Sequence, residues 1–171
     1  MPQGFRFTGV PDAEELQGCS GMPSLQRIMK GRVANIECLQ CIPCNPCEKA
    51  CPIGAIHLNG KMSNMPVLDE EKCVGCGQCI AHCPGLAITV INQVYTPSTA
   101  TLDFPYEYLP LPSVGEKVKA VNRAGKIVGE ATVLAVIKDQ GCSKTYVIRI
   151  EAAKDIINEA RSIQRLAGKE S

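Results

Sequence analysis

Two matching runs of cysteine between residues 41 and 84 constrain this chain more than any other feature. They read Cys41-Ile-Pro-Cys44-Asn-Pro-Cys47-Glu-Lys-Ala-Cys51-Pro52 and Cys73-Val-Gly-Cys76-Gly-Gln-Cys79-Ile-Ala-His-Cys83-Pro84. Each cysteine of the second run lies 32 residues after its counterpart, and the same offset carries Pro52 onto Pro84 and Ala55 onto Ala87. One offset shared by so many positions indicates a tandem duplication of a four-cysteine unit.

The spacing C-x2-C-x2-C-x3-C-P resembles that of the bacterial two-cluster ferredoxins, which hold two [4Fe-4S] clusters. In that family the first three cysteines of one motif share a cluster with the fourth cysteine of the other. The resemblance, which covers residues 32–92, therefore implies two crossed ligand sets. Cluster I would be bound by Cys41, Cys44, Cys47 and Cys83, and cluster II by Cys73, Cys76, Cys79 and Cys51.

Two other uses of crowded cysteines are a structural zinc site and a disulfide framework. Zinc sites usually pair two CxxC units across a longer gap, whereas here three cysteines recur in one short loop and are followed by Cys-Pro. A disulfide framework fits less well still, because cysteines this close together without a secretory leader suit metal thiolates better.

The bulk properties place the chain among ordinary globular proteins. Its 171 residues allow one or two domains, and a net charge of +1 does not imply a basic face for nucleic acid. The sequence contains no run of 18 apolar residues, so we expect no transmembrane helix, and the first residues lack the apolar core of a signal peptide. We expect a cytoplasmic protein, whose clusters would be safest in an anaerobic cell.

The predicted fold class is α+β, with a pseudo-twofold ferredoxin-like domain that holds the two clusters and a small antiparallel β meander or barrel that ends in a helix. The predicted parts are an N-terminal extension (1–31), the two-cluster ferredoxin domain (32–92), a Pro/Tyr-rich arm (93–113) and a small β domain with its helix (114–171). Each half of the ferredoxin domain should contain a strand, a cluster loop, a short helix and a strand. The expected strands are 32–37, 55–58, 66–68 and 86–91, and the expected helices begin near Cys47 and Gln78.

The remainder of the chain reads mostly as β structure. The arm should be extended and should pack on its own domain or on another subunit. Alternating polar and apolar residues predict strands over 116–121, 126–137 and 144–150, with Gly129 at a bulge or bend. An apolar stripe over 151–167 predicts a C-terminal helix. No catalytic motif stands in 93–171.

Three cysteines fall outside the two ligand sets. A shifted register that used Cys38 would need its fourth cysteine at position 48, which is Glu48, so Cys38 is expected to be a buried non-ligand thiol near cluster I. Cys19 lies in a glycine-rich turn and reads as a small packed residue, the alternative being a contact beside a partner's cofactor. Cys142 lies in a predicted turn and is also expected to be a non-ligand.

Two low-potential clusters without surrounding substrate chemistry imply a one-electron relay. The layout of extension, arm and β domain is similar to that of iron–sulfur small subunits of multi-subunit, flavin-dependent dehydrogenases that oxidise amino acids or amines such as proline, sarcosine or opine. That resemblance implies an electron-transfer subunit, not an enzyme on its own, in a hetero-oligomer with flavin-containing subunits. The alternatives are a free ferredoxin carrier with an added domain, and an adaptor whose clusters only hold the fold.

The charge distribution favours the fixed subunit over the free carrier. Residues 1–92 have a net charge of −1 and residues 93–171 a net charge of +2. Neither part has the strong acidic field that steers a diffusing ferredoxin to a basic docking site. The apolar arm and a β domain without chemistry instead suit a permanent interface.

Overall fold

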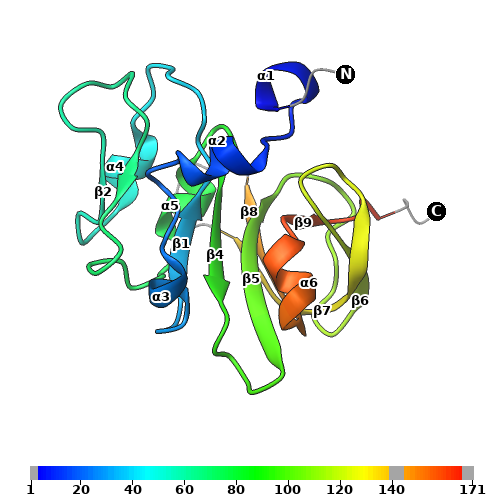
Figure 1. Ribbon diagram of the computed structural model, residues 1–171. Coiled ribbons are helices and arrows are strands. Elements are labelled where there is room, and N and C mark those ends of the chain that lie inside the picture. Colours follow the sequence, from blue (N-terminus) through cyan, green and yellow to red (C-terminus); the bar gives the residue numbers. More distant parts are fainter. Residues whose placement is uncertain (1–3, 139–144, 167–171) are drawn as a thin grey trace.

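One long antiparallel sheet runs through most of the protein in the computed structural model, which describes residues 4–138 and 145–166. The strand order is β1-β4-β5-β8-β7-β6-β9, and a separate two-stranded sheet joins β2 to β3. Figure 1 shows the cysteine-bearing part with α2 to α5 on one side of the molecule, and β5 to β9 with α6 on the other. The strands are β1 (Val33–Ile36), β2 (Ile56–His57), β3 (Val67–Leu68), β4 (Ile88–Asn92), β5 (Thr99–Tyr106), β6 (Lys117–Val121), β7 (Ile127–Lys138), β8 (Tyr146–Ala153) and β9 (Ser162–Ile163). The helices are α1 (Phe5–Thr8), α2 (Ala13–Gln17), α3 (Leu25–Ile28), α4 (Pro46–Ala50), α5 (Gln78–His82) and α6 (Lys154–Glu159).

The secondary structure predicted for the duplicated unit is confirmed. The short helices α4 and α5 each follow a cysteine loop, and each ends at the fourth cysteine of its motif, Cys51 or Cys83. Strand β1 of the first half pairs with β4 of the second, so that Ile36 lies opposite Ile88. Strand β2 of the first half pairs with β3 of the second. The two halves are thus joined by two antiparallel strand pairs, and the cysteine loops lie between them.

The middle of the predicted arm, residues 99–106, is a strand inside the sheet. Strand β5 pairs with β4 over Thr101–Asp103 and with β8 along its whole length, and Phe104 and Tyr106 are fully buried. Pro105, which has no N–H to donate, lies beyond the reach of β4. Phe104 and Tyr106 therefore pack within their own chain, whereas Tyr108 and Leu109 remain exposed.

The prediction of a C-terminal helix over 151–167 is wrong for most of its length. Strand β8 continues to Ala153, and α6 covers only Lys154–Glu159. Ala160 leaves the helix with an extended backbone (φ −61°, ψ 142°), and β9 then pairs with β6. The apolar stripe does face the core, since Ile157, Ala160 and Ile163 are buried. Pairing with distant strands overrides the local helical periodicity.

Strands β6, β7 and β8 form the predicted meander, and the irregularity predicted at Gly129 is also present. The register between β6 and β7 shifts so that Ala120 faces Gly129 while the next residue, Val121, faces Ile127. Gly129 also lies directly beneath the side chain of Ile156 on α6, where any Cβ would collide with it. The glycine therefore allows α6 to pack closely on the sheet.

A buried carboxylate ties the cysteine-bearing part to the sheet. Asp103 on β5 has a side chain that is 3% exposed, and it pairs with Arg149 Nε of β8 at 2.7 Å. The same carboxylate accepts a hydrogen bond from Arg32 Nη2, just before β1, at 2.7 Å. Since Arg32 Nε also donates to the carbonyl of Gly75 at 3.1 Å, this network reaches the second cysteine loop.

In the described parts of the chain, no helix is both long enough and apolar enough to cross a membrane.

Candidate metal centre

The four cysteines expected at cluster II line one small cavity at the beginning of α5. Cys51, Cys73, Cys76 and Cys79 all contribute to its wall, together with Ile53, Ile56 and Val74. Cys73 and Cys79 are buried, Cys51 is half-buried and Cys76 is exposed. The structure therefore brings the fourth cysteine of the first motif to the three-cysteine loop of the second.

The cysteines expected at cluster I are brought together in part. Cys44, Cys47 and Cys83 line a second cavity of about 160 Å³, whose wall is mostly apolar and includes Ile42 and Ile88. Cys41 is not among the lining residues and lies exposed at the surface. Again the fourth cysteine of one motif, Cys83, joins residues of the other.

Backbone N–H groups donate to three of these sulfur atoms. Ala55 N lies 3.2 Å from Cys51 Sγ, and the repeat-related Ala87 N lies 3.5 Å from Cys83 Sγ. Ala34 N donates to Cys73 Sγ at 3.4 Å. Hydrogen bonds of this kind stabilise negative charge on sulfur, which is the form that binds metal. The duplication has therefore preserved a sulfur-binding contact as well as the cysteines.

Burial makes the inner thiols hard to ionise without a metal. Desolvation, reinforced by neighbouring cysteines, raises the pKa of Cys79 to about 12 and that of Cys47 to about 11. A bound metal supplies the positive charge that the apolar wall lacks. Within the described residues, no group of three Cys, His, Asp or Glu side chains converges on a point that could hold a single metal ion. Four of the proposed ligands line one cavity, and three line the other.

Two glycines shape the second loop, whereas the first loop has Pro43 in place of Gly75 and Asn45 in place of Gly77. Gly75 (φ +64°) and Gly77 (φ +84°) both adopt the left-handed conformation that favours glycine. Gly75 also lies so close to Arg32 that a Cβ would come within 2.5 Å of the Cβ of Arg32. The first loop carries Pro43 and Pro46 near the corresponding positions, and neither can donate a backbone hydrogen bond.

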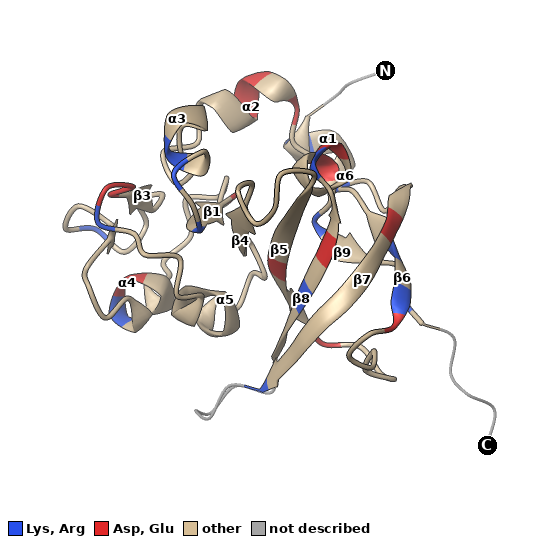
Figure 2. Cartoon of the chain, turned by 90° about the horizontal axis from the view of Figure 1, so that it is seen from below, with Lys and Arg blue, Asp and Glu red and all other residues tan. Residues whose placement is uncertain are grey.

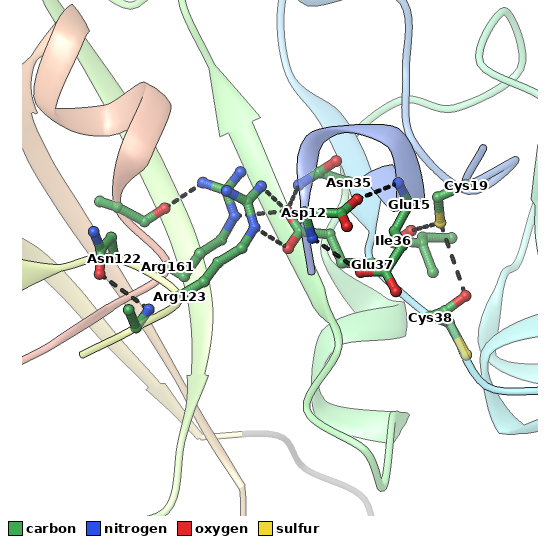
Figure 3. Close-up of polar contacts among 12 residues, drawn as sticks. Asp12, Glu15, Cys19, Asn35, Ile36, Glu37, Cys38, Asn122, Arg123 and Arg161 are labelled. Carbon is green, nitrogen blue, oxygen red and sulfur yellow. Dashed lines mark hydrogen bonds and ion pairs between the residues drawn. The ribbon is translucent and has the colours of Figure 1, made fainter. Parts of the chain in front are cut away.

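The charged residues that hold these loops are absent from the sequence predictions. Glu37, directly after β1, accepts hydrogen bonds from Arg123 and Arg161, each at 2.6 Å (Figure 3). Burial opposes ionisation of Glu37, but the two guanidinium groups outweigh it and hold its pKa below the usual range. Arg27 on α3 donates to several backbone carbonyls, including that of Cys73 at 2.5 Å. No local pattern in the sequence marks these residues, because their partners lie far away along the chain.

The remaining cysteines have separate environments. The expectation that Cys38 is buried is corrected, because it is only half-buried, and it lines the same cavity as Cys44, Cys47 and Cys83. Cys19 is buried, and its Sγ donates to the carbonyl of Ile36 at 3.2 Å (Figure 3), as suits a small packed residue. Cys142 lies outside the described residues.

Comparison with protein families identifies the cysteine-bearing part. Residues 40–87 match a family model described as a 4Fe-4S dicluster domain. Residues 65–132 match a second model of the same description, which extends beyond Cys83 into the sheet.

Three known proteins show what this chain is similar to. An uncharacterized ferredoxin of Methanocaldococcus jannaschii is 32% identical over 108 residues, which cover 63% of this chain and 66% of that protein. ABC transporter E family member 1 of Arabidopsis thaliana is 29% identical over 61% of this chain and 19% of its own length. One of the subunits of an ion-translocating oxidoreductase complex in Methanosarcina acetivorans is 46% identical over 24% of this chain and 14% of its own length. This chain thus spans less than two thirds of each relative, and no solved structure matches it.

The family models, the ferredoxin relative and the paired cysteine loops agree on the chemistry. The protein carries a 4Fe-4S dicluster domain of the ferredoxin type, which holds two [4Fe-4S] clusters. Neither the family models nor these relatives support the similarity to small subunits of amino-acid or amine dehydrogenases.

Proposed function

We propose that this protein relays single electrons between two partners through the two crossed ligand sets. Cys41, Cys44, Cys47 and Cys83 hold cluster I, and Cys51, Cys73, Cys76 and Cys79 hold cluster II. A [4Fe-4S] cluster bound at either site takes up and releases one electron at a time. The protein supplies the ligands, the apolar walls and the hydrogen bonds that set how readily each cluster is reduced.

The observation that best supports a relay is the exposure of one proposed ligand in each set. Cys41 and Cys76 are exposed, while Cys47, Cys73 and Cys79 are buried. An exposed ligand gives a partner close access to one corner of each cluster. Apolar side chains stand beside both positions, with Ile42 52% exposed and Val74 63% exposed. Each cluster thus has its own surface at which an electron can enter or leave.

The proposed context is a larger oxidoreductase that includes a flavin-containing subunit. A flavin exchanges two electrons, and a pair of clusters divides them into single steps. The relative from Methanosarcina acetivorans is named as part of an oxidoreductase complex. Basic and acidic residues are interspersed over the elements in Figure 2, as suits a fixed subunit better than a carrier that is steered by a strong field.

Anaerobic preparation of the full chain tests the cluster assignment. Iron and acid-labile sulfide analysis should give about eight of each per chain by the ligand logic of two cubanes. EPR of the reduced protein should show two interacting centres. Stoichiometric zinc, or a single cluster after reconstitution, would overturn the assignment.

Isolation from the native cell tests the context. The chain should copurify with larger subunits that show flavin absorbance, and it should be poorly soluble when expressed alone. A well-behaved monomer that quickly reduces several unrelated enzymes would instead support the free-carrier alternative.

A second candidate is an adaptor whose clusters only stabilise the fold. It is favoured by the relative from Arabidopsis thaliana, whose name describes a transporter family rather than a redox protein. Reversible bleaching of the visible absorbance by dithionite, with full recovery on reoxidation, would support the relay. Clusters that cannot be reduced without being lost would support the adaptor.

A further inference from the structure

Arg27 places a buried positive charge against the loop of cluster II. The residue is only 9% exposed, although it lies on the short surface helix α3. Its donors reach four backbone carbonyls. They are those of Glu70 (2.7 Å, from Nε), Gly31 (3.4 Å, from Nη1), and Arg32 (2.9 Å) and Cys73 (2.5 Å), both from Nη2.

These carbonyls satisfy the guanidinium donors without cancelling the charge. Among the described residues, no carboxylate forms a hydrogen bond or an ion pair with Arg27. The neighbouring cations differ, because Lys30 pairs with Glu71 at 3.0 Å and Arg32 pairs with Asp103 at 2.7 Å. Arginine tolerates such a site because its guanidinium is weakly hydrated and presents its donors in a fixed plane.

The side chain of Glu70 is the carboxylate that could compensate the positive charge of Arg27. Its carboxylate accepts hydrogen bonds from Ser24 N at 2.6 Å and Ser24 Oγ at 2.8 Å, in an exposed position. Those bonds lower the pKa of Glu70, and the charge of Arg27 adds to the effect. Since Glu70 is more exposed to water than Arg27, its charge is screened more strongly.

Cys73 links this cation to the redox centre. The same residue accepts from Arg27 Nη2 through its carbonyl oxygen and from Ala34 N through its sulfur. Reduction adds one negative charge to a cluster, and an unpaired cation in a medium of low dielectric constant stabilises that charge. We propose that Arg27 tunes cluster II, raising its reduction potential above the value that the loop alone would give. This inference rests on the proposed assignment of Cys73 as a ligand.

Charge-changing variants of the full chain, assembled anaerobically, test this role. EPR-monitored redox titration should show a lower potential for cluster II in Arg27→Gln, with cluster I unchanged. Arg27→Lys retains the charge and should stay close to the wild-type potential, although it loses several of the hydrogen bonds. The matched control is Lys30→Gln, which removes a nearby but exposed and paired charge and should move neither cluster.

Arg27→His provides a test within a single protein, should Arg27→Gln fail to assemble cluster II. Histidine gains its charge between about pH 8 and pH 5, so the cluster II potential of this variant should rise as the pH falls through that range, relative to the wild type. An unchanged cluster II potential in Arg27→Gln, or an equal shift in Arg27→Gln and Arg27→Lys, would overturn the role of the charge. If the wild type itself does not hold two clusters, the ligand assignment fails instead.

Discussion

Gly75 and Arg32 lie against each other so closely that no residue with a Cβ fits at position 75 without a shift of Arg32. A Cβ on Gly75 would lie 2.5 Å from the Cβ of Arg32 and 2.7 Å from its carbonyl carbon, and the φ of Gly75 is +64°. Arg32 in turn binds the carbonyl of Gly75 and the carboxylate of Asp103. The cluster II loop is therefore fitted directly onto the beginning of the sheet.

Replacing Gly75 with alanine should selectively disturb cluster II. The left-handed conformation alone costs an L-residue roughly 1–2 kcal/mol, and the collision with Arg32 backbone atoms adds to that cost. The expected result is loss of about half of the iron, since one of two cubanes is lost, with the EPR signal of cluster I retained. The matched control is Gly125→Ala, which has a similar φ of +72° but open space around its Cβ. Equal iron loss in both variants would show that the contact with Arg32 is irrelevant.

The cysteines outside the proposed sets should be dispensable for cluster binding. Cys19→Ser and Cys38→Ser should keep the full iron content, whereas Cys47→Ser and Cys79→Ser should each lose a cluster. The measurement is iron and sulfide content per chain after anaerobic assembly. Cys38 is the demanding case, because it lines the cavity that Cys41 does not reach. Loss of cluster I in Cys38→Ser would mean that Cys38 takes the place of a proposed ligand.

Cluster I should have the lower reduction potential. Its loop contains Pro43 and Pro46, which have no N–H to offer, and the N–H of Cys44 donates to the carbonyl of Met62 at 3.0 Å. The loop of cluster II contains Gly75 and Gly77, whose N–H groups can approach the sulfurs and stabilise the reduced state.

A redox titration tests this order when each signal is assigned with a ligand variant. Pro43→Gly should raise the potential of cluster I and leave cluster II in place. A wild-type cluster I that is clearly more positive than cluster II would refute the argument from the loops.

Glu37 should contribute to stability at neutral pH and lose that contribution in acid. Its pKa is lowered in the folded protein, because the pull of Arg123 and Arg161 exceeds the effect of burial. A lowered pKa stabilises the fold above the unfolded value of about 4.3, and the effect is lost as the pH falls through the folded value.

Denaturant unfolding of Glu37→Gln and the wild type across this range tests the sign. The difference in unfolding free energy should be largest near pH 7 and should shrink below about pH 4.3. Glu71→Gln is the control, since Glu71 forms an exposed ion pair with Lys30 and should show little difference at any pH. A difference that grows in acid would contradict the assigned direction.

Local sequence patterns predicted the short helices α4 and α5 correctly. The structure of two segments that pair with strands far away in the sequence was not predicted. Cys47 and Gln78 stand in motifs that carry their own loop and helix signals, so α4 and α5 are where the spacing places them. Pro105 suggested an irregular arm. The segment is instead a strand that pairs with β8, and nothing nearby in the sequence reveals a partner some 40 residues later. Ile163 belongs to a helical stripe by periodicity, yet it pairs with Ala120 in a strand.

The residues of the candidate site also differ in whether a local sequence pattern identifies them. The cysteines could be found because a repeated motif marks them, and the crossing of Cys51 and Cys83 between the cavities follows the family resemblance. Arg27 and Asp103 could not be found, because an isolated arginine or aspartate has no pattern. Their importance comes from burial and from partners that lie 46 residues away in each case.

The pairing of β1 with β4 encloses all eight proposed ligands in one loop of the chain, between Ile36 and Ile88. Strands β5 to β9 lie outside this loop and are joined to it through β4. If oxygen destroys a cluster, the ends of the loop remain held by the sheet, so closing it again does not require the chain to refold from its extended state. We therefore expect damage by oxygen to stay within this loop, because the strand pairing that joins its ends involves none of the proposed ligands.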